Sequence, residues 1–215
     1  GSATEAAREA IDYLTSEGKK VGMISVHLYR PFSVKHLFAA VPKTVKKIAV
    51  LDRTKEPGAE GEPLYLDVKS AFYDQENRPV IVGGRYGLGS SDITPAKIIS
   101  VYNNLELPEP KNHFTVGIID DVTFTSLPAV EEMALGGKSI YEAKFFGLGA
   151  DGTVGANKNS VKIIGDNTNK HCQAYFSYDS KKSGGFTCSH LRFGDEPIRS
   201  TYQITTPNFV ACHVQ

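Results

Sequence analysis

The sequence lacks a net charge, because 24 lysine and arginine residues balance 24 aspartate and glutamate residues over its 215 positions. A balanced charge gives no electrostatic footprint for nucleic acid or for an anionic membrane surface. The sequence also lacks any apolar run close to the roughly 20 residues that a helix needs to cross a bilayer. We therefore expect a globular protein with no nucleic acid and no membrane among its partners.

Cysteine is scarce, and its spacing excludes common metal sites. Cys172, Cys188 and Cys212 are far apart and form no C-x-x-C pair of the kind that holds zinc or an iron–sulfur cluster. The first residues also lack the basic segment and apolar core of a secretory signal. We predict reduced thiols, no metal site and a cytoplasmic location.

The chain reads as an internal piece of a longer protein. It does not begin with Met, and residues 4–16 already have the pattern of an amphipathic helix. At the other end, residues 207–215 form an apolar, strand-like stretch. We expect further polypeptide on both sides.

In the first region helices and strands alternate with short connections. The expected helices span residues 4–16, 33–41, 63–72 and 95–104, and the expected strands span residues 21–28, 47–52, 80–84 and 113–120. Short, continuously apolar strands between helices are typical of a parallel sheet covered on both faces. The sequence predicts a doubly wound, mostly parallel α/β domain over residues 1–120, lacking its first strand.

The second region, residues 121–215, has a different pattern. We expect strands at residues 139–146, 171–178, 186–191 and 198–205, and a helix over residues 153–164. The first two strands and the helix between them form a strand–loop–helix–strand unit. The pattern predicts a partial second α/β domain.

A glycine loop, GLGADG at residues 147–152, joins the first of these strands to the helix. Glycine lets the backbone turn tightly and approach a ligand, and the start of the helix offers N–H groups and a positive dipole end to a phosphate. The candidate residues on this side are Gly147, Gly149, Gly152, Thr153, Asn157 and Lys158. The alternative is a tight turn without a ligand.

A second loop carries Lys181, Lys182 and Ser183, followed by two glycines. Two ammonium groups and a glycine backbone suit a phosphate monoester, such as the 3′-phosphate of coenzyme A or the 2′-phosphate of NADP. Loops at the carboxyl ends of neighbouring strands line one crevice in an open α/β sheet. We therefore expect both loops at one anion site, although a solvated loop tip is also possible.

The spacing leaves a dinucleotide-binding alternative open. Asp179 ends the second strand, where a Rossmann domain keeps the acid that binds a ribose. It lies nearer 30 than the usual roughly 20 residues beyond the glycine loop. An NADP-binding oxidoreductase domain that uses Lys181 and Lys182 is therefore one alternative. A purely structural module, whose glycine loop only turns the chain, is another.

Other reactive residue types occur without partners. His190 lies beside Ser189 and near Cys188, but adjacent residues on a strand point to opposite faces, so we predict a structural histidine. Asp120 and Asp121 are two carboxylates with no third metal ligand in view. We predict no catalytic residue in the chain.

Long blocks of the sequence resemble the pyruvate:ferredoxin (flavodoxin) oxidoreductase family. In the first region the blocks are residues 28–68, 80–98 and 110–128, the last reading PKNHFTVGIIDDVTFTSLP. In the second they are residues 145–168 and 177–202, which include FFGLGADGTVG and SYDSKKSGGF. The resemblance covers essentially the whole chain.

The resemblance implies a parent enzyme, generally a homodimer, that decarboxylates pyruvate on thiamine diphosphate. Its electrons pass through [4Fe–4S] clusters to ferredoxin or flavodoxin, and its acetyl group passes to coenzyme A. By resemblance, residues 1–120 are a transketolase C-terminal-like domain and residues 121–215 begin a γ-type, coenzyme A-binding domain. The glycine-loop candidates would then face the thiol arm and diphosphate of the coenzyme. Lys181, Lys182 and Ser183 would hold its phosphate-rich adenosine end.

The chain departs from the family pattern by what it lacks. Thiamine-binding segments and cysteine-rich cluster segments are absent, and three scattered cysteines cannot hold one [4Fe–4S] cluster. Thiamine diphosphate and the clusters are therefore expected in other domains of the parent chain. We predict that this fragment is a scaffold and coenzyme A-binding part that is inactive alone.

Overall fold

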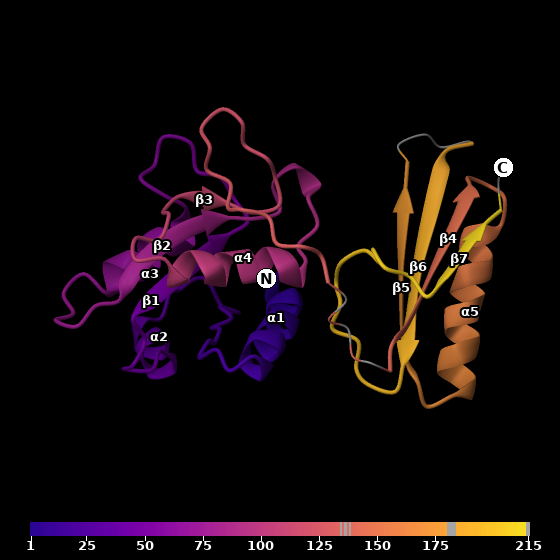
Figure 1. The fold of residues 1–215 in the computed structure, drawn as a ribbon, viewed down its shortest axis with the longest axis horizontal. Helices are drawn as coiled ribbons and strands as arrows, with labels where there is room; N and C mark the ends of the chain where they lie inside the picture. Colours follow the sequence, from indigo (N-terminus) through magenta and orange to yellow (C-terminus); the bar gives the residue numbers. More distant parts are fainter. Residues whose placement is uncertain (134, 136, 138, 180–183, 214–215) are drawn as a thin grey trace. The chain divides into compact units, whose positions relative to one another are not determined.

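The computed structural model describes residues 1–133, 135, 137, 139–179 and 184–213, and it divides into two compact units, Gly1–Met133 and Ala134–Gln215 (Figure 1). The first unit contains α1 (Thr4–Ser16), α2 (Val34–Ala40), β1 (Lys47–Asp52), α3 (Pro63–Ala71), β2 (Val80–Arg85), the short 3-10 turn η1 (Leu88–Ser90), α4 (Pro95–Glu106) and β3 (Phe114–Thr115). The second contains β4 (Tyr141–Leu148), α5 (Thr153–Asn167), β5 (His171–Tyr178), β6 (Phe186–Gly194) and β7 (Phe209–Cys212).

The sheet of the first unit has the order β1-β2-β3, and both strand pairs are parallel. Local signals define where its helices begin. The Ser33 hydroxyl accepts the His36 amide at the start of α2, the Thr94 hydroxyl accepts the Lys97 amide at the start of α4, and Pro95 occupies the first helical position. These observations confirm the predicted α/β class with a parallel sheet.

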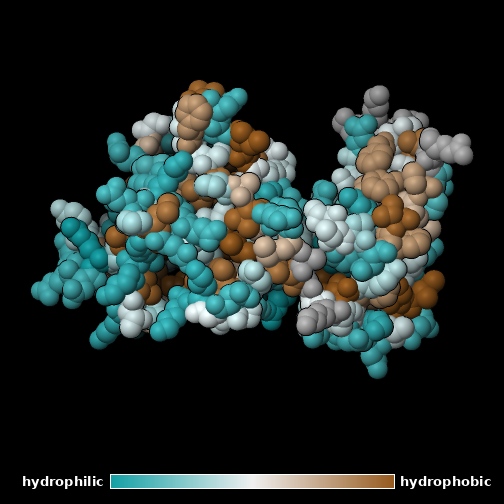
Figure 2. All heavy atoms as spheres, viewed as in Figure 1, coloured by the Kyte–Doolittle hydropathy of each residue, from teal (hydrophilic) through white to brown (hydrophobic). Residues whose placement is uncertain are grey.

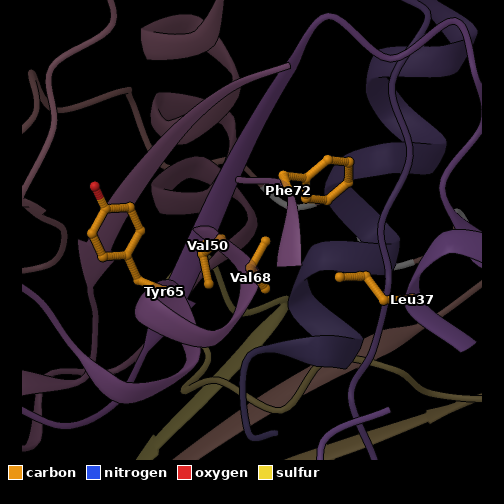
Figure 3. Packing of buried hydrophobic residues seen from close by; sticks show 5 residues of the cluster. All are labelled: Leu37, Val50, Tyr65, Val68 and Phe72. Atoms are coloured by element: carbon orange, nitrogen blue, oxygen red, sulfur yellow. The ribbon is translucent and has the colours of Figure 1, made fainter. Parts of the chain in front are cut away.

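One hydrophobic cluster of the first unit lies where α2 and α3 meet the sheet. Figure 3 shows Tyr65 and Val68 from α3, and Phe72 directly after it, gathered with Val50 from β1 and Leu37 from α2, and all five are buried. Apolar burial of this kind contributes about 25 cal/mol for each Å² removed from water. This cluster therefore stabilises the packing of both helices on the sheet.

The Asp52 carboxylate at the end of β1 ties the sheet to α3. Its two oxygens accept the amides of Leu64 and Tyr65, at 3.2 and 3.1 Å. A carboxylate at this position satisfies N–H groups that have no partner within the helix and complements the positive end of the helix dipole. The end of β1 thus orients the helix that supplies Tyr65 and Val68 to this cluster.

The prediction of a strand at residues 21–28 was wrong: these residues, all of them described, form no strand. Met23, Ile24 and Leu28 are exposed, and the Gly22 carbonyl accepts the Tyr102 hydroxyl instead of a strand amide. An apolar, β-branched run predicts strand propensity only, whereas a strand also needs a hydrogen-bonding neighbour.

The strand predicted at residues 113–120 is shorter than expected. Only Phe114–Thr115 pairs with β2. Gly117 has a φ of +85°, a left-handed conformation that turns the chain out of the sheet. The following residues form a loop.

The second unit has a mixed sheet in the order β5-β6-β4-β7. β6 is antiparallel to both β4 and β5, whereas β7 is parallel to β4. Three strands, β4, β5 and β7, therefore run in one direction and end at the same edge. The helix α5 packs against β4, β5 and β6, on one face of this sheet (Figure 1).

The strand predicted at residues 198–205 was also wrong, because the structure has no strand there and the next one is β7. Ser200 and Tyr202 are buried, and side chains satisfy their carbonyl groups. Gln173 Nε2 donates to the Ser200 carbonyl at 2.8 Å, and Arg192 Nη1 donates to the Tyr202 carbonyl at 2.8 Å. Side-chain donors therefore replace a strand ladder along this segment.

The buried Arg192 guanidinium joins several parts of the second unit. Its Nε donates to Glu142 Oε1 at 2.6 Å, and its Nη1 also donates to Gln173 Oε1 at 3.0 Å. The residue is 1% exposed, and the Glu142 side chain is largely buried. One cation thus links β4, β5 and β6 to residues 200–202.

Replacing Arg192 by Met should lower the free energy of unfolding by about 3–5 kcal/mol, because the Glu142 carboxylate would remain buried without its partner. Urea denaturation of the chain measures this loss. The matched control is Lys170→Met, which removes the more exposed ion pair with Asp195 and should cost less than about 1 kcal/mol. Equal losses of unfolding free energy in the two variants would contradict a special role for the buried pair of Arg192 and Glu142.

His190 lies beside this cluster and is 2% exposed. Its Nδ1 accepts the Ile204 amide at 3.1 Å, so the proton of the neutral ring is on Nε2, 3.5 Å from the Cys188 sulfur. Burial, together with the charges of Lys144 and Arg192, lowers the pKa of His190 to about 4. The ring acts as a buried neutral hydrogen-bonding group, in line with its predicted structural role.

The chain should therefore lose stability in mild acid. The pKa of His190 is about 4 when folded and roughly 6.5 when unfolded, so between these values the unfolded state binds the proton first. Stability from this group is complete above about pH 6.5 and falls by about 2 kcal/mol between pH 7 and pH 5. In His190→Asn, which keeps an acceptor but does not titrate, urea denaturation at both pH values should show a correspondingly smaller change. If the stability of His190→Asn changed with pH as much as that of the unaltered chain, His190 would not be the group responsible for the loss in acid.

Candidate functional site

A pocket of about 360 Å³ lies at the edge of the second unit where β4 and β5 end and β6 begins. One side consists of residues 148–152, 154 and 155, from the glycine loop and the first turn of α5. The other side consists of residues 178, 179 and 185–187, which flank the second loop. The structure therefore brings the glycine loop together with both ends of the lysine-bearing loop.

Asp151 organises the glycine loop. Its Oδ2 accepts the Leu148 amide and its Oδ1 accepts the Thr153 amide, both at 2.8 Å. The hydrogen bond from the Thr153 amide is the main cause that lowers the pKa of Asp151. A Cβ on Gly147 would come within 2.5 Å of Asp151 Oδ2 and 2.6 Å of Thr153 Oγ1, so only glycine fits there.

The two loops are joined by a direct backbone contact. The Gly149 amide donates to the Gly185 carbonyl at 2.7 Å, and the Asp179 amide donates to the Phe186 carbonyl at 2.9 Å. A Cβ on Gly149 would lie 3.5 Å from the Gly185 oxygen, which is ordinary contact. Both ends of the second loop are thus anchored beside the glycine loop.

The start of α5 faces the pocket, and one of its backbone amides already donates a hydrogen bond within the loop. Gly152 is the N-cap in a left-handed conformation and makes no side-chain cap bond, while the Thr153 amide is taken by Asp151. Val154 and Gly155 line the pocket, and their amides belong to the first turn, where a helix supplies no carbonyl partner. An anion at this site would therefore bind the amides of residues 154 and 155 and not that of Thr153.

The other predicted site residues lie in different surroundings. Thr153 and Asn157 are buried, and Asn157 Nδ2 donates to the Thr153 carbonyl at 3.0 Å. The Lys158 ammonium lies 5.5 Å from the centre of the Phe176 ring. Lys181, Lys182 and Ser183 lie outside the described residues. Of the six predicted residues that the structure describes, Gly149 and Gly152 line the pocket directly.

One contact at this edge was not predicted from the sequence. His213 follows β7; its amide donates to the Phe146 carbonyl at 3.1 Å, and its Nδ1 lies 3.1 Å from Thr153 Oγ1. The apolar pattern of residues 207–215 predicts a strand but does not identify β4 as its partner. The sequence analysis also did not single out three residues that line the pocket, namely Tyr178, Phe186 and Thr187.

No group of three or more His, Cys, Asp or Glu side chains suited to a metal ion occurs among the described residues. Cys188 is buried, Cys172 is half-buried and Cys212 is exposed. Within the same part of the chain, no helix is both long enough and apolar enough to cross a membrane.

Gly147→Ala should destabilise the second unit by about 1–3 kcal/mol, because the new methyl group would collide with Asp151 and Thr153. Gly155→Ala is the matched control in the same segment. A Cβ there meets nothing within 4 Å, so alanine should raise helix stability by up to about 1 kcal/mol. Thermal or urea denaturation distinguishes the two, and a neutral effect of Gly147→Ala would contradict the described loop geometry.

Comparison with known proteins agrees with the resemblance seen in the sequence. Residues 1–98 match the family model for pyruvate:ferredoxin oxidoreductase core domain II, and residues 142–215 match that for pyruvate ferredoxin/flavodoxin oxidoreductase. The chain is 60% identical to pyruvate-flavodoxin oxidoreductase of Enterobacter agglomerans and 58% identical to that of Klebsiella pneumoniae. It is 55% identical to pyruvate:ferredoxin oxidoreductase of Moorella thermoacetica.

The alignments cover 100%, 100% and 99% of this chain, respectively, and 18% of each relative. The chain thus spans slightly less than a fifth of the length of these relatives. Two family models and three relatives aligned over almost every residue give the same result: the chain belongs to the pyruvate:ferredoxin/flavodoxin oxidoreductase family.

Proposed function

We propose that the chain is the scaffold and coenzyme A-binding part of an enzyme that oxidatively decarboxylates pyruvate to acetyl-CoA and CO₂. The names of the relatives support this activity for the parent protein, with ferredoxin or flavodoxin as the electron acceptor. Thiamine diphosphate and [4Fe–4S] clusters would be bound by other domains of the parent, which are the first partners of this chain. The chain alone would not turn over pyruvate.

The hydrogen bond between Gly149 and Gly185 carries the ligand assignment. It holds the second loop against the glycine loop at the pocket. In the sequence Lys181 and Lys182 lie between Asp179 and Gly185, whose backbones make these contacts. This arrangement supports a site in which backbone amides and ammonium groups meet the same anionic ligand.

Each group of site residues would then have its own role in binding the coenzyme. Gly149 and Gly152 permit close approach of the coenzyme, and the amides of Val154 and Gly155 would bind its diphosphate. Thr153 and Asn157, which are buried, would hold the first turn of α5 in position together with Gly147. Lys158 would add positive charge along α5, and Lys181, Lys182 and Ser183 would bind the 3′-phosphate.

The strand order favours coenzyme A over the NADP alternative. In a Rossmann unit, the two strands joined by the helix are hydrogen-bonded to each other in parallel. Here β6 lies between β4 and β5 and is antiparallel to both. The pocket volume of about 360 Å³ is within the range of small-molecule sites, which favours a ligand over a purely structural turn.

In the parent enzyme, Lys181→Ala combined with Lys182→Ala should raise the KM for coenzyme A by about 100-fold, because each lost charge-assisted contact is worth about 1.5 kcal/mol, or about tenfold in affinity. The kcat at saturating coenzyme A should change little. Dephospho-coenzyme A, which lacks the 3′-phosphate, should bind the double variant and the unmodified enzyme almost equally.

Lys19→Ala is the control, because Lys19 forms an exposed ion pair with Glu106 in the first unit and should leave the KM unchanged. Calorimetry of the 215-residue chain with coenzyme A and with NADPH tests the alternative that the chain is an NADP-binding domain. An unchanged KM in the double variant, or tighter binding of NADPH than of coenzyme A, would refute the proposal.

A further inference from the structure

A loop of the first unit, residues 116–126, follows β3 and is built around Asp120. The Asp120 carboxylate accepts the amides of Val122, Thr123 and Thr125, at 3.1, 2.9 and 3.0 Å, and also the hydroxyl groups of Thr123 and Thr125. Five donors on one carboxylate define a single loop conformation. These hydrogen bonds, that of the Thr123 hydroxyl foremost, hold the pKa of Asp120 well below its usual range.

The base of the loop is tied to the rest of the unit. Lys111 Nζ donates to the carbonyls of Phe124 and Ser126, at 2.9 and 3.3 Å. The Ser126 hydroxyl donates to the Ile118 carbonyl at 2.8 Å, and the Thr115 amide donates to the Thr125 carbonyl at 3.0 Å. These contacts hold the loop by polar groups of its backbone and side chains, and none of them involves the side chain of Ile119, Val122 or Phe124.

Three apolar side chains of the loop are exposed to solvent, whereas Val116 at its start is buried. Ile119 is 93% exposed, Val122 is 80% exposed and Phe124 is 71% exposed, and we call these three the apolar loop tip. Figure 2 shows brown, apolar side chains at the top of the first unit, where Figure 1 places this loop. Phe124 has a φ of +55°, an unusual conformation for a large side chain.

A rigid loop that exposes three large apolar side chains within six residues is typical of a docking element. Exposed apolar clusters mark sites of association, and a preorganised conformation reduces the entropy lost on binding. Residues 99–141, which include the loop, lie outside both matched family models. We propose that the apolar loop tip docks into an apolar pocket with a basic rim on another domain of the parent polypeptide.

Two observations select this occupant. The chain spans 18% of its relatives, so most of the parent surface lies outside it. Asp121, next to the tip, is exposed and negatively charged. A twofold contact between two copies of the tip would bring like charges together, whereas a basic rim on a different surface complements them. The proposal does not depend on coenzyme A binding.

Hydroxyl-radical footprinting tests whether the tip is covered. With the radical dose calibrated by a free reporter, Phe124 should be modified at least about tenfold more slowly in the full-length parent than in the 215-residue chain. Tyr73, an exposed aromatic residue elsewhere in the same unit, shows how far the parent shields an unrelated position. Equal modification of Phe124 in both proteins would overturn the proposal.

The occupant is identified by replacing Phe124 with a photo-cross-linking amino acid in the full-length protein. In a mixed population of isotope-labelled and unlabelled copies, cross-links should join segments of one copy and end on an apolar segment outside residues 1–215. Cross-links between labelled and unlabelled copies, or to added ferredoxin or flavodoxin, would refute the assigned occupant.

Phe124→Ser should lower the Tm of the full-length protein but leave the urea midpoint of the 215-residue chain unchanged. Tyr73→Ser is the matched control and should change neither measurement. A loss of stability in the 215-residue chain itself would mean that Phe124 supports its own unit, which contradicts a docking role.

Discussion

The Asp151 carboxylate determines how β4 turns into α5, and the geometry of the pocket depends on that turn. Its two oxygens hold the amides of Leu148 and Thr153 together, and the space that it occupies leaves room only for glycine at position 147. The turn brings Gly149 to the Gly185 carbonyl and so joins the two loops. The same carboxylate takes up one amide of the helix start and places a negative charge there, so fewer amides are left for an anion.

In the second unit, polar side chains of the sheet hold residues 200–204 in place, where no strand ladder forms. Arg192 and Gln173 satisfy carbonyl groups of residues 200–202, and His190 accepts the Ile204 amide. Such a buried polar layer has a high desolvation cost, and apolar side chains of similar volume often stabilise a fold equally well. Its hydrogen bonds, however, specify where an irregular segment lies, which apolar contacts do less well. The orientation of that segment leads the chain into β7, beside β4.

The two units present two chemically different surfaces. The pocket of the second unit combines glycine backbone with the anchored ends of a basic loop and suits an anionic small molecule. The apolar loop tip of the first unit suits a large apolar partner surface. Both fit a chain that is slightly less than a fifth as long as its relatives. In such a setting, part of the surface is expected to contact neighbouring domains.

The sequence by itself determined the features that depend on near neighbours. Ser33, Thr94 and Pro95 define helix starts, continuous apolar runs identify β1 and β2, and the glycine pattern locates the turn into α5. Only the tertiary structure decided which segments pair. Residues 21–28 and 198–205 have strand-like composition but no strand neighbour, whereas His213 reaches Thr153 across 60 positions of sequence. The physical reason is that caps and turns are satisfied within a few residues, while a strand or a pocket needs hydrogen-bond partners that only the folded chain brings together.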